Sequence, residues 1–440
     1  MVAMLPFMLV AASGLCRHPP ETMQQIKDRL LSNYDKSTRP TQAMMEREVA
    51  SMPPPASGEP NCTLAPPERV QTQFYIDYMS VDQKKQEYTV EGFLRVFWKD
   101  ERLAFGNDTN PECVCLTSLI FENDADLWTP DLYFERVIKL ALAGTGPGAG
   151  FGTLLTIDRE GNVVWSRQSA ITLRCPMHFG NIPFDSHSCP YTMGLYSQTA
   201  SDVILEWLDP VKALDNWKAV GTSLWDITNM RAHNDVQAYS TGTYTYAVAA
   251  LDIKRQEQGY ITSYIIIAIF LVMVSFGGVF VSAAAVPARA AIAVVTLIVV
   301  VNTGNSARAQ LPPFSYSTWM TDFLFYSTLF NLFFFFEFAA ANFGVQIDQH
   351  YKKLEADAKA KETEMTSSPM SGVAEADGVK LIQIKTAPAA MQSVKMIVVP
   401  YMRALKDSDY YVRRGFPFVY LLFIIIIYSQ IGNYPSAAGR

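Results

Sequence analysis

The sequence predicts a mixed fold: an all-β, immunoglobulin-like extracellular sandwich followed by a four-helix transmembrane bundle. Two patterns carry this prediction. Of the 440 residues 49% are hydrophobic, and in the second half of the chain these residues gather in four runs, at 260–281, 290–303, 323–343 and 416–431. In the first half, polar and apolar residues alternate in segments separated by Gly, Pro, Asn and Asp, as in strands with one buried face.

Residues 1–15 have the form of a cleaved secretory signal. The stretch "MVAMLPFMLVAASGL" has a short apolar core followed by small residues, although no basic residue precedes the core. Export agrees with the N-glycosylation sequons at Asn61 and Asn107. We therefore assign residues 16–256 to an extracellular domain, in a compartment where disulfides persist.

The extracellular domain is expected to begin with a helix and continue as strands. An amphipathic helix is predicted over about residues 20–34, and residues 42–60 have the composition of a flexible insertion. The alternating segments that follow predict strands, and "REGNV" predicts a hairpin turn between two of them. Several short strands at this spacing favour a sandwich or a barrel.

The four apolar runs predict the membrane domain. Crossing the ~30 Å hydrocarbon core takes a helix of about 20 residues. We assign residues 257–343 to three transmembrane helices and residues 412–432 to a fourth. Four spans return the C-terminal tail, residues 433–440, to the outside. The sequence thus predicts a multi-pass plasma-membrane protein with an extracellular N-terminal domain and an extracellular C-terminus.

Residues 344–411 are predicted to form a cytoplasmic loop between the third and fourth spans. Lys, Glu, Ala, Ser and Met dominate residues 352–395, a composition typical of disordered segments. A helix is expected near residues 391–411, leading into the fourth span.

Two of the six cysteines, Cys175 and Cys189, enclose thirteen residues in "CPMHFGNIPFDSHSC". A metal site would need ligands at short, regular spacing, and a redox pair is normally closer together. The remaining interpretation is a disulfide that closes a loop, worth ~3 kcal/mol in the chain-entropy estimate. The other cysteines have no assigned partner: Cys16, Cys62, Cys113 and Cys115.

The second apolar run has the charge pattern of an anion pathway. No Asp or Glu lies between Glu257 and Asp322, whereas Arg289 and Arg308 flank the run. Cation pores usually carry rings of acidic side chains, and anion pores favour basic ones. We expect Arg289 near the inner mouth and Arg308 near the outer one. Alternatively, both arginines anchor helix ends at the membrane interface.

Six motifs, in order along the chain, resemble one family. Together with the cysteine pair and four spans, they identify the chain as similar to a subunit of the Cys-loop receptors, which are pentameric ligand-gated ion channels, and within these to the glycine and GABA-type-A branch. Two departures are His187, where the family usually has Gln, and a first span without the usual proline. The motifs are "FLRVFWKDERL" (93–103), "WTPDLYF" (128–134), "CPMHFGNIPFD" (175–185), "YSTGTYT" (239–245), "VPAR" (286–289) and "RAQLPPFSY" (308–316).

The resemblance implies a transmitter site between neighbouring subunits. Aromatic faces can hold an ammonium group, and an arginine with hydroxyls can hold a carboxylate, which points to a small amino-acid-like agonist. Gly194 stands where receptors for glycine or GABA have an acidic residue, and Glu135 is a candidate to compensate. One face is expected to use Tyr133, Tyr196, Tyr239, Thr241 and Tyr244, and the neighbour's face Phe93, Arg95, Leu154 and Ser166.

The resemblance also implies a pore and a gating junction. Ile298 is expected to form a hydrophobic ring, with Val295 one turn further in, that closes the pore by dewetting. The expected pore-lining residues are Pro287, Ala288, Arg289, Ala291, Val295, Ile298, Asn302 and Asn305. Gating is expected to involve Asp185, Arg255, Arg308 and Pro312, with membrane-edge snorkelling as the alternative role of Arg255.

The predicted function is therefore a chloride channel opened by a small amino-acid-like ligand, assembled as a homo- or hetero-pentamer in membrane lipid. Alternatives are the same fold gated by protons or another signal, or a non-conducting receptor. An enzyme is not expected, because the sequence has no Gly-rich phosphate loop, metal-ligand spacing or nucleophile elbow. No cofactor, metal or nucleic-acid partner is expected.

Overall fold

The structure is a computed structural model that describes residues 22–51, 65–105, 116–121, 126–142, 152–367, 405 and 407–434. The predicted signal, the sequons at Asn61 and Asn107, the four unassigned cysteines and most of the helix expected near 391–411 lie outside the described residues. The chain divides into two units. Unit 1 comprises Met1–Met177 and Ser186–Arg255, and unit 2 comprises His178–Asp185 and Gln256–Arg440.

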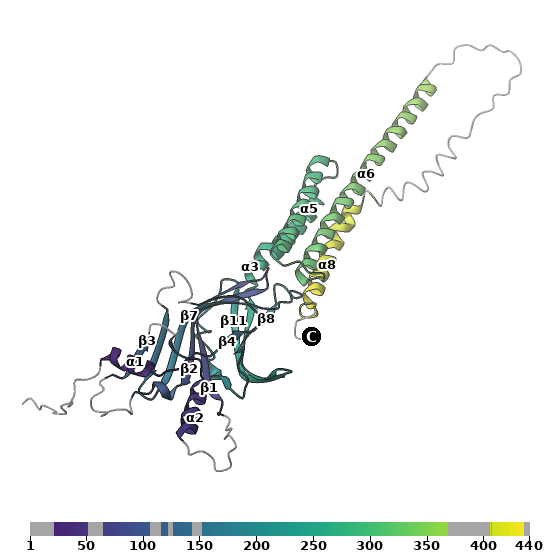
Figure 1. Ribbon diagram of the computed structural model, residues 1–440. Helices are drawn as coiled ribbons and strands as arrows, with labels where there is room; N and C mark the ends of the chain where they lie inside the picture. The colour runs from purple at the N-terminus through teal and green to yellow at the C-terminus, as the bar shows by residue number, and fades with distance from the viewer. Residues whose placement is uncertain are drawn as a thin grey trace, which may run out of the picture. The chain divides into compact units, whose positions relative to one another are not determined.

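Unit 1 is built on two β-sheets, drawn in Figure 1. In the larger sheet the strand order is β10-β1-β2-β7-β6-β3, with β5 also paired to β7 and β9 to β1. Its strands are β1 (Glu68–Asp82), β2 (Glu87–Lys99), β3 (Ser118–Phe121), β5 (Val137–Leu142), β6 (Thr153–Asp158), β7 (Asn162–Arg174), β9 (Val203–Trp207) and β10 (Leu214–Asp215). The smaller sheet has the order β11-β12-β8-β4, with β11 (Trp225–Tyr239), β12 (Gly242–Arg255), β8 (Ser186–Leu195) and β4 (Leu132–Phe134).

The core of unit 1 lies between these sheets. Alternate residues of β2, β7 and β12 are buried, which is the period-two pattern of strands with one face inward. Across the core, the rings of Phe74 and Tyr191 lie 5.8 Å apart, and the Trp207 indole donates to the Val248 carbonyl at 3.0 Å. The predicted sandwich is therefore confirmed.

Two helices precede the first strand. Helix α1 (Met23–Leu31) begins with a capping box in which Thr22 and Gln25 exchange hydrogen bonds, and it falls within the predicted helix over residues 20–34. Helix α2 (Pro40–Ser51) begins with proline, whose missing N–H costs nothing at that position. The prediction of a flexible insertion over 42–60 is thus wrong for residues 42–51. The prolines and glycine that suggested flexibility all follow Ser51.

Unit 2 contains four helices long and apolar enough to cross a membrane, as predicted. The first span, Gln258–Gly278, consists of α3 (Gln258–Tyr260), a π-turn (Ile261–Ile265) and α4 (Ile266–Gly278). The others are α5 (Val286–Ala309), α6 (Trp319–Ser367) and α8 (Ser408–Ser429). Between these helices, the Ser275 hydroxyl bridges the Thr296 hydroxyl at 2.6 Å and the Asn331 side-chain oxygen at 2.5 Å.

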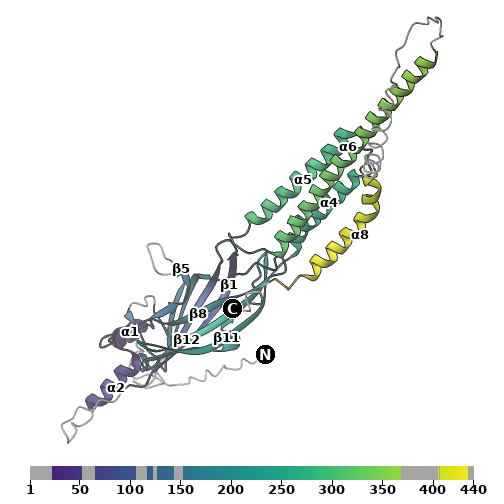
Figure 2. The same ribbon diagram turned by 90° about the vertical axis from the view of Figure 1, so that its right-hand side faces the viewer.

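Helix α6 is longer than the sequence suggested (Figure 2). It continues through residues 344–367, so the prediction of disorder over 352–395 is wrong for residues 352–367. Lys, Glu and Ala in this segment are strong helix formers. Pairs one turn apart add support, with Lys352 3.0 Å from Asp348 and Lys359 3.9 Å from Glu355.

The cysteine loop contributes to both units. Cys175 and Cys189 form the expected disulfide in unit 1, whereas residues 178–185 pack within unit 2. There the His178 and Tyr316 rings stack 4.4 Å apart, and the Trp319 amide donates to the Gly180 carbonyl at 2.8 Å. The loop tip thus contacts the segment that follows α5.

Candidate functional site

The outer face of the smaller sheet carries the first group of predicted ligand-binding residues. Strand register places Tyr133 opposite Gly194, and Gly194 opposite Tyr246, in one row across β4, β8 and β12. The neighbouring residues Phe134 and Thr245 point into the core, so the row faces outward. Tyr196 is 74% exposed, and its ring lies 5.9 Å from that of Tyr133. These tyrosines form an outward aromatic surface.

The hairpin between β11 and β12 supplies the remaining residues of this group. The Tyr239 and Tyr244 rings lie 5.9 Å apart, and the Tyr244 hydroxyl donates to the Thr241 hydroxyl at 3.3 Å. Gly242 has φ +142°, a conformation that side chains rarely adopt, so glycine suits this turn. The structure therefore brings the predicted residues together on the smaller sheet. We call the outward tyrosines of this sheet the tyrosine face: Tyr133, Tyr196, Tyr239, Tyr244 and Tyr246.

The outer face of the larger sheet carries the second predicted group. Register places Arg95 opposite Ser166, and Ser166 opposite Leu154, in one row across β2, β7 and β6. The Arg95 guanidinium donates to the Gln73 side-chain oxygen at 3.3 Å and lies 5.3 Å from the centre of the Tyr75 ring. Among the described residues, no carboxylate lies within ion-pair distance of Arg95. Its charge is therefore available to an anionic ligand group.

Phe93 completes this second surface. It lies opposite Tyr75 in the strand register, with the rings 6.5 Å apart. Because Leu94 and Val96 are buried, Phe93 and Arg95 on alternate positions point outward. We call this surface the arginine face: Phe93, Arg95, Leu154 and Ser166.

The two faces belong to opposite sides of one sandwich. Packed sheets lie about 10 Å apart, and side chains on the two outer faces point away from each other. One chain therefore cannot close a site from its own two faces.

One residue of the tyrosine face, Tyr246, was not predicted to bind ligand, and Glu135 at its border was named only as a candidate to compensate for Gly194. Tyr246 stands opposite both Gly194 and Asp235, and Glu135 follows Tyr133 on the same side of β4. The two-residue alternation along β12 and β4 gives the signal, since Tyr246 is two residues from Tyr244 and Glu135 is two from Tyr133. Burial raises the pKa of Tyr246 well above its usual range, and the neighbouring Tyr239, Tyr133 and Glu135 raise it further.

Helix α5 separates into an exposed and a buried side. Val295 and Ile298 are 57% and 54% exposed, and they line up with the other predicted pore residues on the exposed side. Pro287, Ala288, Ala291, Asn302, Asn305 and Arg308 are also exposed. This stripe is free to face a pore axis.

Arg289 does not belong to this stripe, and its prediction as a pore-lining residue is wrong. Its side chain is 2% exposed, donates to the Gly278 and Val279 carbonyls at 3.0 Å each, and pairs with Asp409 of α8 at 2.8 Å. Each residue turns a helix by about 100°, so Arg289 points roughly 200° away from Ala291. It shares its side with the buried residues Ala293, Thr296, Val300 and Ala307.

The predicted gating residues lie in both units. In unit 1, Arg255 is 1% exposed, stacks 4.1 Å from the Trp225 ring and donates to the Gln83 side chain at 2.6 Å. This burial contradicts the alternative of a snorkelling arginine. In unit 2, Asp185 is buried, Pro312 is half-buried and Arg308 is exposed. Whether Arg255 meets the loop tip stays a prediction.

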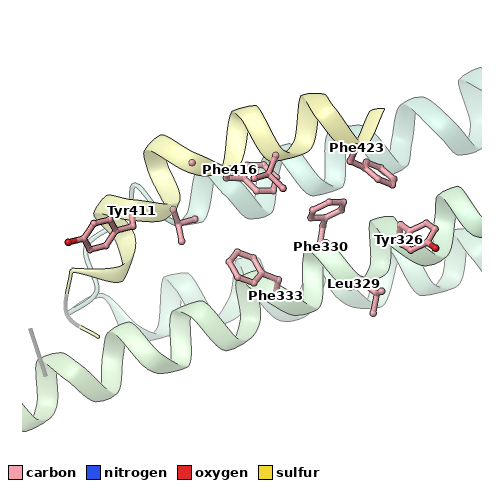
Figure 3. A pocket seen from close by; sticks show the side chains of 10 residues that line it. Tyr326, Leu329, Phe330, Phe333, Tyr411, Phe416 and Phe423 are labelled. Carbon is pink, nitrogen blue, oxygen red and sulfur yellow. The ribbon is translucent and has the colours of Figure 1, made fainter. Parts of the chain in front are cut away.

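A separate apolar groove of about 530 Å³ runs between α6 and α8 (Figure 3). Aromatic rings from both helices line it, with Phe330 and Phe333 on α6 facing Phe416 and Phe423 on α8. No charged side chain lines this groove, and it lies on helices of membrane-spanning length. It is distinct from both outward faces of the sandwich.

A two-sheet sandwich followed by four helices of membrane-spanning length is an architecture typical of membrane receptors. Residues 57–257 match the family described as neurotransmitter-gated ion-channel ligand binding domain. The chain is also 28% identical over 325 residues to the gamma-aminobutyric acid receptor subunit alpha-2 of Bos taurus, Rattus norvegicus and Homo sapiens. The match covers 72% of this chain and spans 65% of the length of these curated relatives. Residues 57–257 are therefore a neurotransmitter-gated ion-channel ligand-binding domain, and the chain as a whole is similar to the Cys-loop receptors of the GABA branch, a family of channels that are not enzymes.

Proposed function

We propose that this chain is a subunit of a pentameric ligand-gated anion channel in the plasma membrane, opened by a small amino-acid-like ligand bound between subunits. One observation carries the proposal. The tyrosine face and the arginine face have complementary chemistry and lie on opposite outer sides of one sandwich. A ring of subunits brings them together once at each interface, as a closed cyclic assembly does.

The two faces favour a ligand with an anionic and a cationic end. Arg95 and Ser166 present a guanidinium and a hydroxyl, which suit a carboxylate. The tyrosine rings present π-faces that attract an ammonium group. Both faces occur in one chain, so a homopentamer has five complete sites.

Anion selectivity is supported by the charge along α5, although not through Arg289. No Asp or Glu lies between Glu257 and Asp322, and Arg308 is exposed at the end of α5 opposite Val286. The helix begins at Val286 with no acidic residue in its first turn and no side-chain cap. Its first N–H groups carry the positive end of the helix dipole, which favours an anion near Pro287 and Ala288.

Voltage-clamp recording of the full chain tests the proposal. A panel of glycine, γ-aminobutyrate, β-alanine and taurine is applied, followed by an acidic step without ligand. We expect an amino acid to evoke a current whose reversal potential follows the chloride gradient. A current that follows sodium contradicts anion selectivity, and a current evoked by acid alone contradicts the amino-acid ligand. A surface-expressed receptor that passes no current under any condition contradicts the channel.

A further inference from the structure

The tyrosine face has a gap at Gly194 that Tyr246 fills. A Cβ atom at position 194 would lie 2.6 and 2.7 Å from two ring carbons of Tyr246, closer than real Cβ contacts. No side chain, acidic or otherwise, fits at this position while Tyr246 keeps its place. The smaller sheet therefore offers no charge from the middle of β8, and a ligand cation needs a carboxylate from a neighbouring strand.

Glu135 is the carboxylate that directly follows the adjacent strand, β4, in the turn after Phe134. Its amide donates to the Thr192 carbonyl at 3.0 Å, so Glu135 stands beside Thr192, one outward position along β8 from Gly194. Neighbours on a diagonal of a sheet face are about 7–8 Å apart, within reach of a long side chain. The Glu135 carboxylate also raises the pKa of Tyr246 electrostatically, as a smaller cause after burial and the neighbouring tyrosines.

The Glu135 carboxylate is available to a ligand. Its ion-pair partner among the described residues is Arg136, at 3.8 Å, with the Glu135 and Arg136 side chains 45% and 51% exposed. Pairs at this distance and exposure are weak, because water screens both charges. A ligand ammonium that also contacts tyrosine rings is partly desolvated and competes well with this partner.

A second carboxylate on the same side of the sheet, Asp235, is already engaged. It lies opposite Tyr246 on β11, on the far side from β4. Its carboxylate accepts hydrogen bonds from the Gln237 side chain and the Val236 amide, each at 2.9 Å. These bonds lower the pKa of Asp235, with the Gln237 bond the largest cause. Asp235 therefore serves as the matched control.

We propose that Glu135 binds the ammonium end of an amine-bearing agonist, with Tyr133, Tyr196 and Tyr246 surrounding the cation. This inference rests on the proposed function, because it assigns a charge partner within the same ligand site. Because the Tyr246 ring covers Gly194, the ligand cation binds nearer to β4 than to β8. The agonist class is a small molecule that carries a primary amine and, facing Arg95, a carboxylate.

The experiment measures dose–response curves of surface-expressed variants. Each amino acid of the panel is paired with its amine-free analogue, such as butyrate for γ-aminobutyrate. Glu135→Gln keeps the size of the side chain and removes its charge. We expect it to raise the half-maximal concentration of the best amino-acid agonist roughly tenfold or more, the strength of one charge-assisted hydrogen bond. Glu135→Asp retains the charge and should recover part of this loss.

Two controls separate recognition from folding. Asp235→Asn should leave the half-maximal concentration unchanged, and Arg136→Gln should leave it unchanged or lower it, because a competing cation is removed. Surface labelling checks that every variant reaches the membrane. A structural role of Glu135 would lower surface expression or affect both members of an agonist pair equally, and either result overturns the proposal.

The remaining outcomes distinguish the inference from the proposed function. Equal potency of wild type and Glu135→Gln toward the amino acid overturns the inference and leaves the ligand-gated channel standing. The inference is also overturned, and the channel is left standing, if amine-free carboxylates open the wild-type receptor as strongly as amino acids do. A receptor that no compound opens overturns the proposed function and the inference together.

Discussion

Loss of the buried Arg289–Asp409 ion pair should destabilise the membrane unit without changing ion selectivity. Arg289 joins three helices, because its guanidinium donates to carbonyls at the end of α4 and pairs with Asp409 of α8. The Arg289 and Asp409 side chains are 2% and 15% exposed. Among the described residues, replacing Arg289 with Met leaves Asp409 with only the more distant Arg413, at 3.8 Å, and removes one of the donors to each of the two carbonyls.

The expected magnitude follows from this burial. Removing one partner of a buried ion pair costs ~3–5 kcal/mol, whereas replacing both partners with apolar side chains is often neutral. Each 1.4 kcal/mol is about a factor of ten in an equilibrium constant. Arg289→Met and Asp409→Leu should each lower the folded-to-unfolded ratio roughly a hundredfold or more. The double variant should recover most of this loss.

The assay is thermal unfolding of the detergent-solubilised receptor, with surface expression measured in parallel. Arg413→Gln is the comparison: Arg413 is 40% exposed, lies 3.8 Å from Asp409 in a pair worth about 0–1 kcal/mol, and donates to the Val279 carbonyl at 2.8 Å, so its loss should destabilise less than the loss of Arg289. If the destabilisation of the double variant equals the sum of the destabilisations of the two single variants, the coupling between Arg289 and Asp409 is refuted. The double variant should also keep the wild-type reversal potential. A shift toward cations would mean that Arg289 faces the pore.

Three further predictions concern the extracellular unit. Replacing Cys175 and Cys189 with Ser should remove about 3 kcal/mol of loop-closure stabilisation and abolish surface expression; free thiols at both positions in mass mapping of exported wild-type protein would contradict the bond. Arg95→Ala should raise the half-maximal concentration of a carboxylate agonist about tenfold or more, whereas Gln73→Ala, which removes the hydrogen-bond partner of Arg95 and a bond to the Lys212 carbonyl but keeps the positive charge, should have a smaller effect; equal shifts would assign Arg95 a structural role. Burial raises the pKa of Glu68 from 4.5 to about 7, so its contribution to stability is complete below about pH 4.5 and is lost as the pH rises through about 7. Thermal unfolding should therefore show that Glu68→Gln stabilises the domain more at alkaline than at acidic pH, and the opposite order would contradict the sign.

Much of the architecture was predictable because hydropathy reports burial directly. The strands β2 and β7 alternate between buried and partly exposed residues along nearly their whole length, which is the pattern that the sequence displays. The membrane spans are predictable for a similar reason, since length and apolarity alone identify them. The predictions from composition were wrong at two places, where flexible or disordered chain was expected and the structure has a helix. In α2 and the end of α6 the local residues are helix formers, and the disorder signal came from segments beyond them.

The positions of the side chains at the candidate site depend on how strands pair and how helices pack. The sequence of a single strand or helix does not show this. Helix α5 is apolar on nearly every side, so hydropathy does not fix which residues face inward, and Arg289 was assigned to the wrong side. The buried residues Ala293, Thr296 and Val300 follow Arg289 at helical spacing, so a helical count along the sequence places all four on the same side of α5. The contact between Tyr246 and Gly194 depends on the pairing register of β12 and β8, which the sequence alone leaves open.

The pairing of β8 with β12 connects the tyrosine face to the start of the membrane unit through the backbone. Register runs without a shift from Tyr246 opposite Gly194 to Lys254 opposite Ser186. At the end of this ladder, β8 is preceded by the loop residues of unit 2, and β12 is followed by Gln256 of unit 2, two residues before the first membrane segment begins at Gln258. An antiparallel ladder resists slippage because a one-residue shift exchanges its buried and exposed faces. Under the proposed function, a ligand that contacts Tyr246 would therefore act on two paired strands, β8 and β12, whose ends continue covalently into the membrane unit.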